Sequence, residues 1–246
     1  MTRLVAKISA AVAAAAVGAG LALDGAGVWA ASRAEIVVLV VAAGLLASGS
    51  TSISAVSEFR SRRLGAAQTL VEVTLTGTAW AIVDAAGIDF RDLGLAAYRV
   101  ERIWWQPWQQ RLRRVHRIRA RFRPAASGID WAPGKGVIGA CVVQGQVVAQ
   151  DIRAIYDAIG ECTEEEWNYV VPAEARQGLS YREYLAVADK YDIVVATPIL
   201  DDSGATTSTV GCVALDGPAD TLDRLSADDV LGLLDSAAQS LLRQSR

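Results

Sequence analysis

The chain has 246 residues, of which 52% are hydrophobic and 21% charged, and its mean hydropathy is +0.26. This composition excludes a disordered chain, a collagen-like chain and a small disulfide-stapled domain, and the length allows one domain and a further segment. The net charge of −3 conceals an asymmetry, because residues 91–123 hold ten basic and two acidic side chains, whereas residues 124–246 hold eight and nineteen. Such a division is typical neither of a general nucleic-acid-binding protein nor of a uniformly acidic one.

Two apolar stretches open the chain, residues 4–23 and residues 36–56. The first contains one charge, Lys7, and the second contains none. A helix of about 20 residues crosses the apolar core of a bilayer, so the sequence predicts a transmembrane helical hairpin and stalk over residues 1–63. Two alternatives stay open: the first stretch is a cleaved signal peptide, or the second is a buried helix of a soluble domain.

The flanking charges predict the orientation. Arg3 and Lys7 stand at the start of the first stretch and Arg33 is the basic residue of the connecting loop, whereas a basic cluster follows the second stretch. That cluster consists of Arg60, Arg62 and Arg63. Because cytoplasmic flanks carry the excess of lysine and arginine, we expect a multi-pass protein of the cell inner membrane whose C-terminal domain, residues 64–246, is cytoplasmic.

The rest of the chain mixes helix and strand signals. Residues 65–84 continue the second apolar helix, although β-branched residues around Val71 locally favour a strand. Residues 111–123 alternate with period 2, which predicts a strand, and further strands are expected at residues 93–100, 145–152, 193–200 and 209–215, with turns at 106–109 and 201–204. Helices are expected after residue 139, at residues 163–167 with Thr163 as N-cap, at residues 181–191, and from Ser226 onward. This order is typical of an α+β fold with an antiparallel sheet.

Short motifs add to this pattern. They are GKGVIG at residues 134–139, VVAQDI at residues 147–152, ATPI at residues 196–199 and VGCV at residues 210–213, ahead of the C-terminal amphipathic helix. In this order they resemble the GAF family of small sensory domains, over roughly residues 65–246. The resemblance implies a six-stranded antiparallel sheet flanked by helices, a small-molecule pocket on one side, and a homodimer formed through the helices at either end. It also implies pocket candidates, whose alternative role is core packing: Trp131, Cys141, Trp167, Tyr181, Tyr184 and Thr197.

The GKGVIG segment satisfies the G-x-G-x-x-G spacing of dinucleotide-binding loops. That function needs a strand just before the first glycine, whereas the residues at 130–133 are Asp-Trp-Ala-Pro. The sequence therefore favours a tight turn into a helix, with the glycines supplying backbone freedom. A helix N-terminus at this point, assisted by Lys135, is suited to an anionic ligand group.

The three cysteines, expected as free thiols in a reducing compartment, are candidates for reactive chemistry. Cys141 falls early in the predicted helix, where the helix N-terminus lowers a thiol pKa, whereas the glutamates around Cys162 disfavour its thiolate. Cys212 alternates within a strand as a core residue. Some GAF proteins are thiol-dependent reductases of free methionine sulfoxide, but their motif has cysteine where Ile138 stands, and no second cysteine has a suitable spacing. We therefore expect no enzyme.

The single histidine, His116, is on the strand face predicted for Leu112, Ile118 and Phe122, so we expect a packed core residue. No metal-ligand spacing accompanies it, which predicts no metal site. The Asn-Lys-Phe-Asp-Glu signature of cyclic-nucleotide-binding GAF domains is absent from the sequence, and the cofactor stays unknown.

An arginine-rich strand is the most unusual feature. Six arginines share one face by alternation: Arg111, Arg113, Arg117, Arg119, Arg121 and Arg123. Three interpretations are open, namely ion pairs with the acidic half, contact with the anionic inner leaflet, and contact with an anionic partner, nucleic acid being the least favoured. Beside them stand Trp104, Trp105 and Trp108, which either pack into the core or dock on another surface. We hypothesise that these tryptophans and arginines together form a lipid or partner contact.

Together these features predict a membrane-anchored sensory module that binds a small molecule or a partner. With no output domain recognised in the sequence, the signal is expected to pass to a separate protein, through a homodimer that shifts between states. The alternative is a non-catalytic structural or effector membrane protein that uses the GAF-like fold as an interaction module; a thiol-dependent reductase is less favoured. No nucleic acid is expected as a partner.

Overall fold

The computed structural model describes residues 18, 22, 25–26, 68–120 and 128–245, and the chain divides into two compact units, Met1–Ala66 and Ala67–Arg246. The apolar stretches predicted to cross the membrane lie outside the described residues, apart from isolated positions. Within the described ranges, no helix combines the length and the apolar character needed to cross a membrane. The fold and the site below belong to the second unit.

This unit begins with a helix that covers residues 68–86, followed by the short 3-10 helix η1 (Phe90–Asp92). The strands are β1 (Gly94–Ile103), β2 (Gln106–Arg119), β3 (Val148–Asp151), β4 (Ile193–Asp201) and β5 (Ser208–Gly217). Between β2 and β4 come the helices α3 (Gly136–Gln144), α4 (Ile152–Ile159), α5 (Glu164–Tyr169), α6 (Ala173–Arg176) and α7 (Tyr181–Val187). After β5 come α8 (Leu222–Leu225) and α9 (Asp228–Ser245).

The strands form one sheet in the order β2-β1-β5-β4-β3, in which every neighbouring pair is antiparallel. The predicted α+β class with an antiparallel sheet is therefore confirmed. The sheet of the described residues has five strands, one fewer than the GAF resemblance implies.

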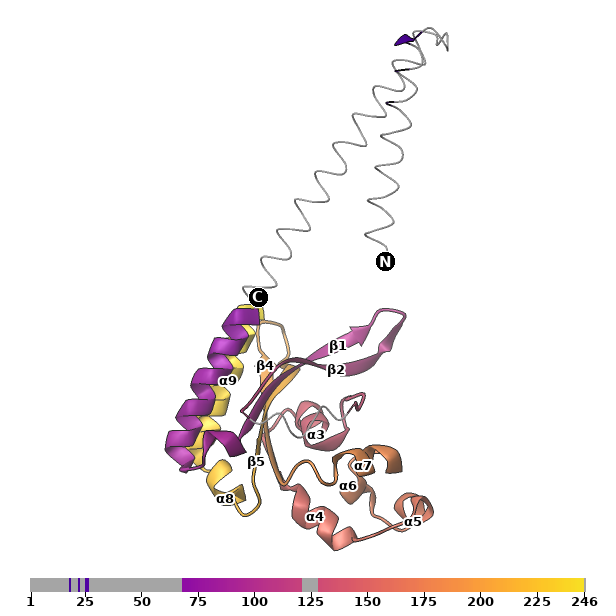
Figure 1. Ribbon diagram of the computed structural model, residues 1–246, viewed down its shortest axis with the longest axis vertical. Helices are drawn as coiled ribbons and strands as arrows, with labels where there is room; N and C mark the ends of the chain where they lie inside the picture. Colours follow the sequence, from indigo (N-terminus) through magenta and orange to yellow (C-terminus); the bar gives the residue numbers. More distant parts are fainter. Residues whose placement is uncertain (1–17, 19–21, 23–24, 27–67, 121–127, 246) are drawn as a thin grey trace. The chain divides into compact units, whose positions relative to one another are not determined.

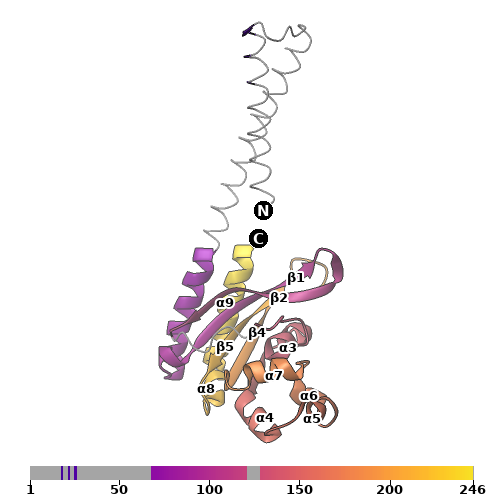
Figure 2. The ribbon, with the colours of Figure 1, turned by 45° about the vertical axis from the view of Figure 1, so that its right-hand side comes forward.

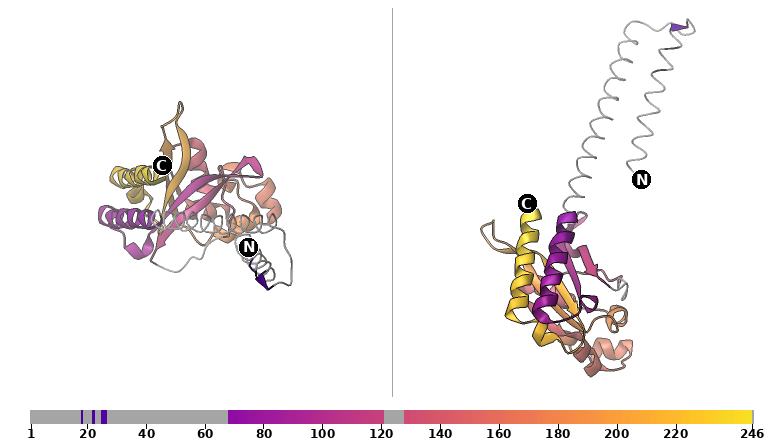
Figure 3. Two further views of the ribbon diagram at one scale, coloured as in Figure 1. Left: turned by 90° about the horizontal axis from the view of Figure 1, so that it is seen from above. Right: turned by 60° about the vertical axis from the view of Figure 1, so that its left-hand side comes forward.

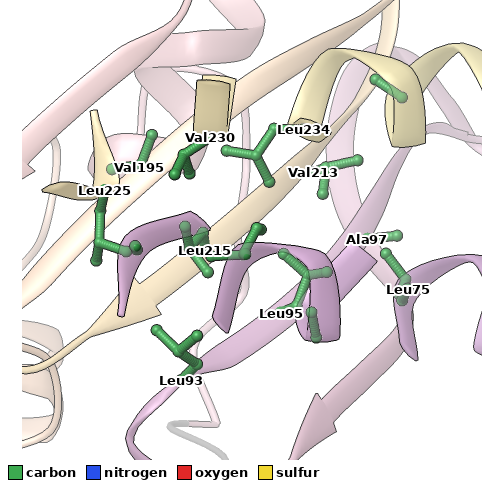
Figure 4. Close-up of a cluster of buried hydrophobic side chains, with 14 of the residues drawn as sticks. Leu75, Leu93, Leu95, Ala97, Val195, Val213, Leu215, Leu225, Val230 and Leu234 are labelled. Atoms are coloured by element: carbon green, nitrogen blue, oxygen red, sulfur yellow. The ribbon is translucent and has the colours of Figure 1, made fainter. Parts of the chain in front are cut away.

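Helices cover both faces of this sheet (Figures 1 and 3). The helix of residues 68–86 and α9 lie side by side on one face, and α3 to α7 lie on the other. Leu95, Val195 and Leu215 point from the strands into the two-helix layer, where they meet Leu75 and Leu234 (Figure 4). We call this face of the sheet the helix-pair face and the opposite one the cavity face.

The helix of residues 68–86 decides between the two expectations for this segment. Its buried side chains are Val71, Leu75, Ala79, Ile82 and Ala86, a spacing of three or four residues that lines one side of a helix. Burial of that stripe against the sheet outweighs the local strand preference of the β-branched residues, so the strand expectation around Val71 is wrong.

Helix caps account for other boundaries. The carboxylate of Asp151 accepts a hydrogen bond from the Ala154 N–H at 2.7 Å, so Ile152 starts α4 instead of ending a strand as the sequence predicted. Thr163 caps α5 as predicted, in a reciprocal capping box with Glu166. Three helices were not predicted from the sequence: α4, α6 and α8. The helices α6 and α8 have four residues each, too few for an apolar period, whereas α4 does carry a helical apolar period, which the strand prediction over residues 145–152 overlooked.

The hairpin between β1 and β2 turns at Trp104 and Trp105. Residues 106–109, which the sequence predicted as the turn, belong to β2.

A bulge then changes the side on which the arginines of β2 lie. Ala97 pairs with His116 and Tyr98 with Arg114, so that Val115 is an extra residue on β2. Each residue beyond the bulge lies on the face opposite to the one that strict alternation predicts.

The predicted single arginine face is therefore wrong. Arg111 and Arg113 lie on the same side as Glu101, whereas Arg117 and Arg119 lie on the cavity face with Asp216. Arg121 and Arg123 lie outside the described residues.

The bulge also separates His116 from Leu112. Leu112 belongs to the apolar cluster on the cavity face. Ile118, which follows His116 on the same side of β2, packs on the helix-pair face. His116 itself is half-buried. The predicted face that joined Leu112 and His116 is wrong, and Phe122 lies outside the described residues.

Candidate ligand-binding site

A cavity of about 70 Å³ lies on the cavity face of the sheet. Its floor contains Ala96 and Ala214, which face each other on β1 and β5. Their short side chains leave space that larger residues would fill. Since about 10–15 Å³ is enough for one water-sized group, the cavity is large enough for a molecule of several non-hydrogen atoms.

The walls of the cavity are rich in aromatic side chains: Tyr98, Trp131, Tyr156 and Tyr191. Burial raises the pKa of Tyr98 to about 12, and burial also raises the pKa of Tyr156 to about 12. Both hydroxyls are therefore protonated at neutral pH and are available as hydrogen-bond donors. The amide of Gln177 adds a further polar group to the wall, and it donates to the side chain of Gln150 at 2.6 Å.

One wall of the cavity is charged. Nη2 of Arg117 lies 4.0 Å from Oδ1 of Asp216, and the Arg119 guanidinium also donates to this carboxylate. The side chains of Arg117, Arg119 and Asp216 are 15%, 14% and 11% exposed. Both guanidinium carbons lie about 6 Å from the centre of the Tyr191 ring. Both guanidinium groups thus lie beside the same carboxylate.

A glycine makes the charged wall possible. Arg119, Gly94 and Asp216 stand in one row across β2, β1 and β5. Because Gly94 has no side chain, the carboxylate of Asp216 lies over β1, where the guanidinium of Arg119 donates to it. A Cβ atom at Gly94 would overlap the carboxylate group of Asp216.

Arg117 has a hydrogen-bonding group that the described residues do not satisfy. Its Nη2 is buried and finds no hydrogen-bond acceptor within the described part of the chain. An unsatisfied buried donor costs about 1–3 kcal/mol, and more when it is charged. Arg117 also lines the cavity, so an acceptor bound there would satisfy this group.

Of the pocket candidates predicted from the sequence, Trp131 lines the cavity. Trp167, Tyr181 and Tyr184 do not; they form an aromatic cluster between α5 and α7. Trp167 stacks on Tyr184 at 4.2 Å between ring centres, and its Nε1–H donates to the Leu179 carbonyl at 3.1 Å. The cluster packs the helices, and it meets the cavity through the edge contact between Tyr156 and Tyr184 at 4.9 Å.

Thr197 lies away from the cavity. It pairs with Val213, whose side chain packs in the core of the helix-pair face, so the side chain of Thr197 shares that face. Thr197 therefore does not line this cavity. The sequence pattern assigns Arg117 and Arg119 to a different surface. It gives no indication of the other residues at this site, which are Tyr98, Tyr156, Gln177, Tyr191 and Asp216. The one signal that pointed here is the series of small residues within strands, Gly94, Ala96 and Ala214.

The thiols occupy the core beside the cavity. Cys141 and Cys212 are both fully buried, which confirms the core position predicted for Cys212. A hydrogen bond with Cys141, together with burial, raises the pKa of Cys212 well above its ordinary value. The fold therefore places a second cysteine beside Cys141, contrary to what the spacing in the sequence suggested. Cys141 does not line the cavity. It also lies beyond the first turn of α3, whereas the helix dipole acts most strongly within that turn.

Cys162 behaves as its neighbours in the sequence predict. Burial and the carboxylate of Glu166 both raise its pKa, so the thiolate is disfavoured. Within the described ranges, no three His, Cys, Asp or Glu side chains gather as metal ligands.

The GKGVIG segment leads through a turn into a helix, as predicted, but the helix begins within the segment and not after it. Gly134 and Gly136 have φ values of 83° and 63°, and α3 starts at Gly136. Lys135 does not point to a ligand group, because its Nζ binds Oε1 of Glu183 at 2.8 Å. This ion pair joins the turn to α7.

Comparisons with known proteins give the following. No protein-family profile matches the chain, and no curated protein matches it. Among solved structures, it is similar to a GAF domain/HD domain protein from Geobacter sulfurreducens, with 12% identity, a TM-score of 0.41, and 74% of this chain and 97% of that one covered. It is also similar to NreA from Staphylococcus aureus mutated in its nitrate-binding site, with 16% identity, a TM-score of 0.34, and 72% and 98% covered.

Proposed function

We propose that this protein is a membrane-anchored, GAF-like sensory module that binds a small anion in the cavity and signals through a separate protein. Arg117 lines the cavity, and the observation that supports the proposal most directly is that its buried Nη2 lacks a hydrogen-bond acceptor among the described residues. A carboxylate or another small oxyanion supplies the missing acceptor.

The size and the lining of the cavity restrict the chemical class of the ligand further. A volume of about 70 Å³ suits an anion of a few non-hydrogen atoms. The hydroxyls of Tyr98 and Tyr156 are protonated donors, so they also favour an acceptor-rich ligand. The floor of alanines and the aromatic walls suit a short apolar tail.

The position of Asp216 connects the cavity to the helices. An anion bound at Nη2 of Arg117 competes with Asp216 for the same guanidinium. The reason is that Nη2, which lacks an acceptor among the described residues, is the Arg117 atom that faces the Asp216 carboxylate, at 4.0 Å. Asp216 lies near the end of β5, whose opposite face packs against α9 and the helix of residues 68–86. In this proposal, ligand binding shifts β5 and changes the packing of the terminal helices, through which a homodimer communicates with its partner.

The anchoring part of the proposal comes from the apolar stretches 4–23 and 36–56 and their flanking arginines. We propose an inner-membrane protein with a cytoplasmic C-terminal domain, no catalytic activity of its own and no nucleic-acid partner. Protease added to intact cells tests this: the C-terminal half is expected to stay uncleaved until the cells are opened, and cleavage in intact cells would contradict the orientation.

The ligand proposal is tested by thermal unfolding of the full chain in detergent. Sodium formate, acetate and propionate are compared with sodium chloride at equal ionic strength. At 100 times the dissociation constant, a bound anion adds about 2.7 kcal/mol of stability, which corresponds to a rise of about 5–10 °C in Tm. The Arg117→Gln variant is expected to lose this rise.

Arg114→Gln is the matched control, because Arg114 is exposed on the same strand and its loss changes the net charge equally. The control is expected to keep the full response. An equal loss of response in both variants would show a general charge effect and would contradict a site at Arg117. No response from the wild-type chain, with no small molecule retained in native mass spectrometry, would favour the structural or effector alternative.

A further inference from the structure

The end of the β1–β2 hairpin projects beyond the rest of the sheet (Figures 1 and 2). The pairing of β1 with β5 ends at Arg99 and Gly211, whereas the pairing of β1 with β2 continues to Ile103 and Gln106. Residues 100–112 therefore include a two-stranded ribbon without a third strand beside it. We call this segment the tryptophan ribbon.

Three tryptophans stand at the end of this ribbon and remain in solvent. Trp104, Trp105 and Trp108 are 85%, 63% and 76% exposed. Trp104 and Trp105 meet edge to face at 5.6 Å between ring centres, which holds two indoles together at the turn. The core-packing alternative for these residues is therefore wrong. Large exposed aromatic groups at one place mark a contact surface.

The ribbon and its base are strongly positive. Five exposed arginines accompany the tryptophans: Arg99, Arg102, Arg111, Arg113 and Arg114. The acidic side chain between residues 99 and 114 is Glu101, which binds both Arg111 and Arg113 at 3.0 Å. Four positive charges thus remain in excess over this stretch.

We propose that the tryptophan ribbon docks on the surface of an anionic lipid bilayer. The indoles match the headgroup region, where an apolar ring and a polar N–H are both accommodated. The arginines match the phosphates of an anionic leaflet, which attracts basic residues close to the surface. This surface is separate from the cavity, and its docking does not depend on the ligand proposed above.

The shape of the ribbon favours a bilayer over a protein partner. A stable protein interface buries about 800 Å² on each side in a surface of matching shape, whereas the ribbon is a narrow projection of two strands. A bilayer surface adapts to an inserted side chain and needs no matching groove. Charge and shape therefore agree on the same occupant.

The test uses the full chain reconstituted into vesicles whose lipids carry bromine on the acyl chains, which quenches nearby tryptophan fluorescence. Vesicles of phosphatidylcholine are compared with an equimolar mixture of phosphatidylcholine and phosphatidylglycerol. The variant W104S/W105S/W108S gives the quenching of the four other tryptophans, which is subtracted from the quenching of the wild-type chain. The control Y169S/V170S removes two side chains that are 84% and 73% exposed at α5 and keeps every tryptophan.

In anionic vesicles, the wild-type chain and the control are expected to show extra quenching that the tryptophan variant lacks. The extra quenching is expected to weaken in neutral vesicles and at high salt. Each exposed arginine raises the equilibrium constant for docking about fivefold. The variant R102Q/R114Q, which loses two of them, is therefore expected to lower this constant about 25-fold. These two arginines are outside the cavity wall, so the anion response of that variant should persist.

Two results would overturn the proposal. Equal quenching of the wild type and the tryptophan variant in anionic vesicles would show that the indoles do not reach the lipid. Equal extra quenching in neutral and anionic vesicles would remove the role of the arginines. Because the substituted side chains are exposed, unchanged circular dichroism and Tm are expected to show that each variant folds.

Discussion

Replacing Gly94 by alanine is expected to disturb the cavity through a single side chain. The added Cβ overlaps the carboxylate of Asp216, which has to move away from Arg117 and Arg119. Inserting one methylene-sized group into a packed interior costs about 1–3 kcal/mol, and a lost hydrogen bond to a charged group adds about 1.5–3 kcal/mol. We expect a loss of about 3 kcal/mol, or a fall of about 6–12 °C in Tm for a unit of this size.

Thermal unfolding of the full chain measures this loss, and Gly77→Ala is its matched control. Gly77 lies exposed in the helix of residues 68–86 with no atom near the position of an added Cβ, so alanine there is expected to stabilise by about 0.5–1 kcal/mol. The same substitution thus has opposite effects at the two sites. A double-mutant cycle with Asp216→Ala isolates the overlap. If Gly94→Ala costs as much without the carboxylate as with it, the reasoning about Asp216 is refuted.

Two further predictions concern pH. The pKa of Tyr98 and that of Tyr156 are about 12 in the folded chain and 10.0 when exposed, so between these values the unfolded chain releases protons that the folded chain keeps, and stability falls as the pH rises above 10. Absorbance of tyrosinate at pH 11 should show both hydroxyls still protonated, and simultaneous titration of all tyrosines near pH 10 would contradict their burial. Burial acts to raise the pKa of Glu183, but hydrogen bonds from Lys135 and Ser180 outweigh burial and hold that pKa below 4.5. The ionised carboxylate of Glu183 therefore contributes its full stabilisation of the folded chain above pH 4.5. This stabilisation is lost as the pH falls through the pKa of the folded chain. Glu183→Gln, which keeps the capping box, should lower the free energy of unfolding by about 1 kcal/mol at pH 7 and by progressively less below pH 4.5 in acid unfolding experiments; an equal gap at every pH would show that the charge has no role.

The bulge at Val115 connects the two proposals. Without the extra residue, Arg117 and Arg119 would lie on the same side of β2 as Arg111 and Arg113, against the helix-pair face. With it, Arg117 and Arg119 lie with Asp216 on the cavity face, whereas Arg111 and Arg113 lie with Glu101 on the tryptophan ribbon and its base. One irregularity in one strand thus divides a basic sequence between two different surfaces.

Local patterns in the sequence were sufficient for much of the fold. Two apolar segments around the hairpin loop at residues 201–204 predicted the strands β4 and β5, and a threonine followed by three glutamates predicted the capped start of α5. The order of these elements indicated an α+β fold with an antiparallel sheet, which the structure confirms. These features depend on residues close together in the chain, where propensity, period and capping act directly.

Tertiary structure alone decided the composition of the site. Alternation places residues relative to their own strand, but the register and the bulge depend on which strand pairs with β2, so the faces of Arg117 and Arg119 could not be read from their spacing. The approach of Cys141 to Cys212, and of Arg119 to Asp216 across Gly94, joins residues far apart in the chain. Such contacts follow from the packing of whole layers, and no local pattern encodes them.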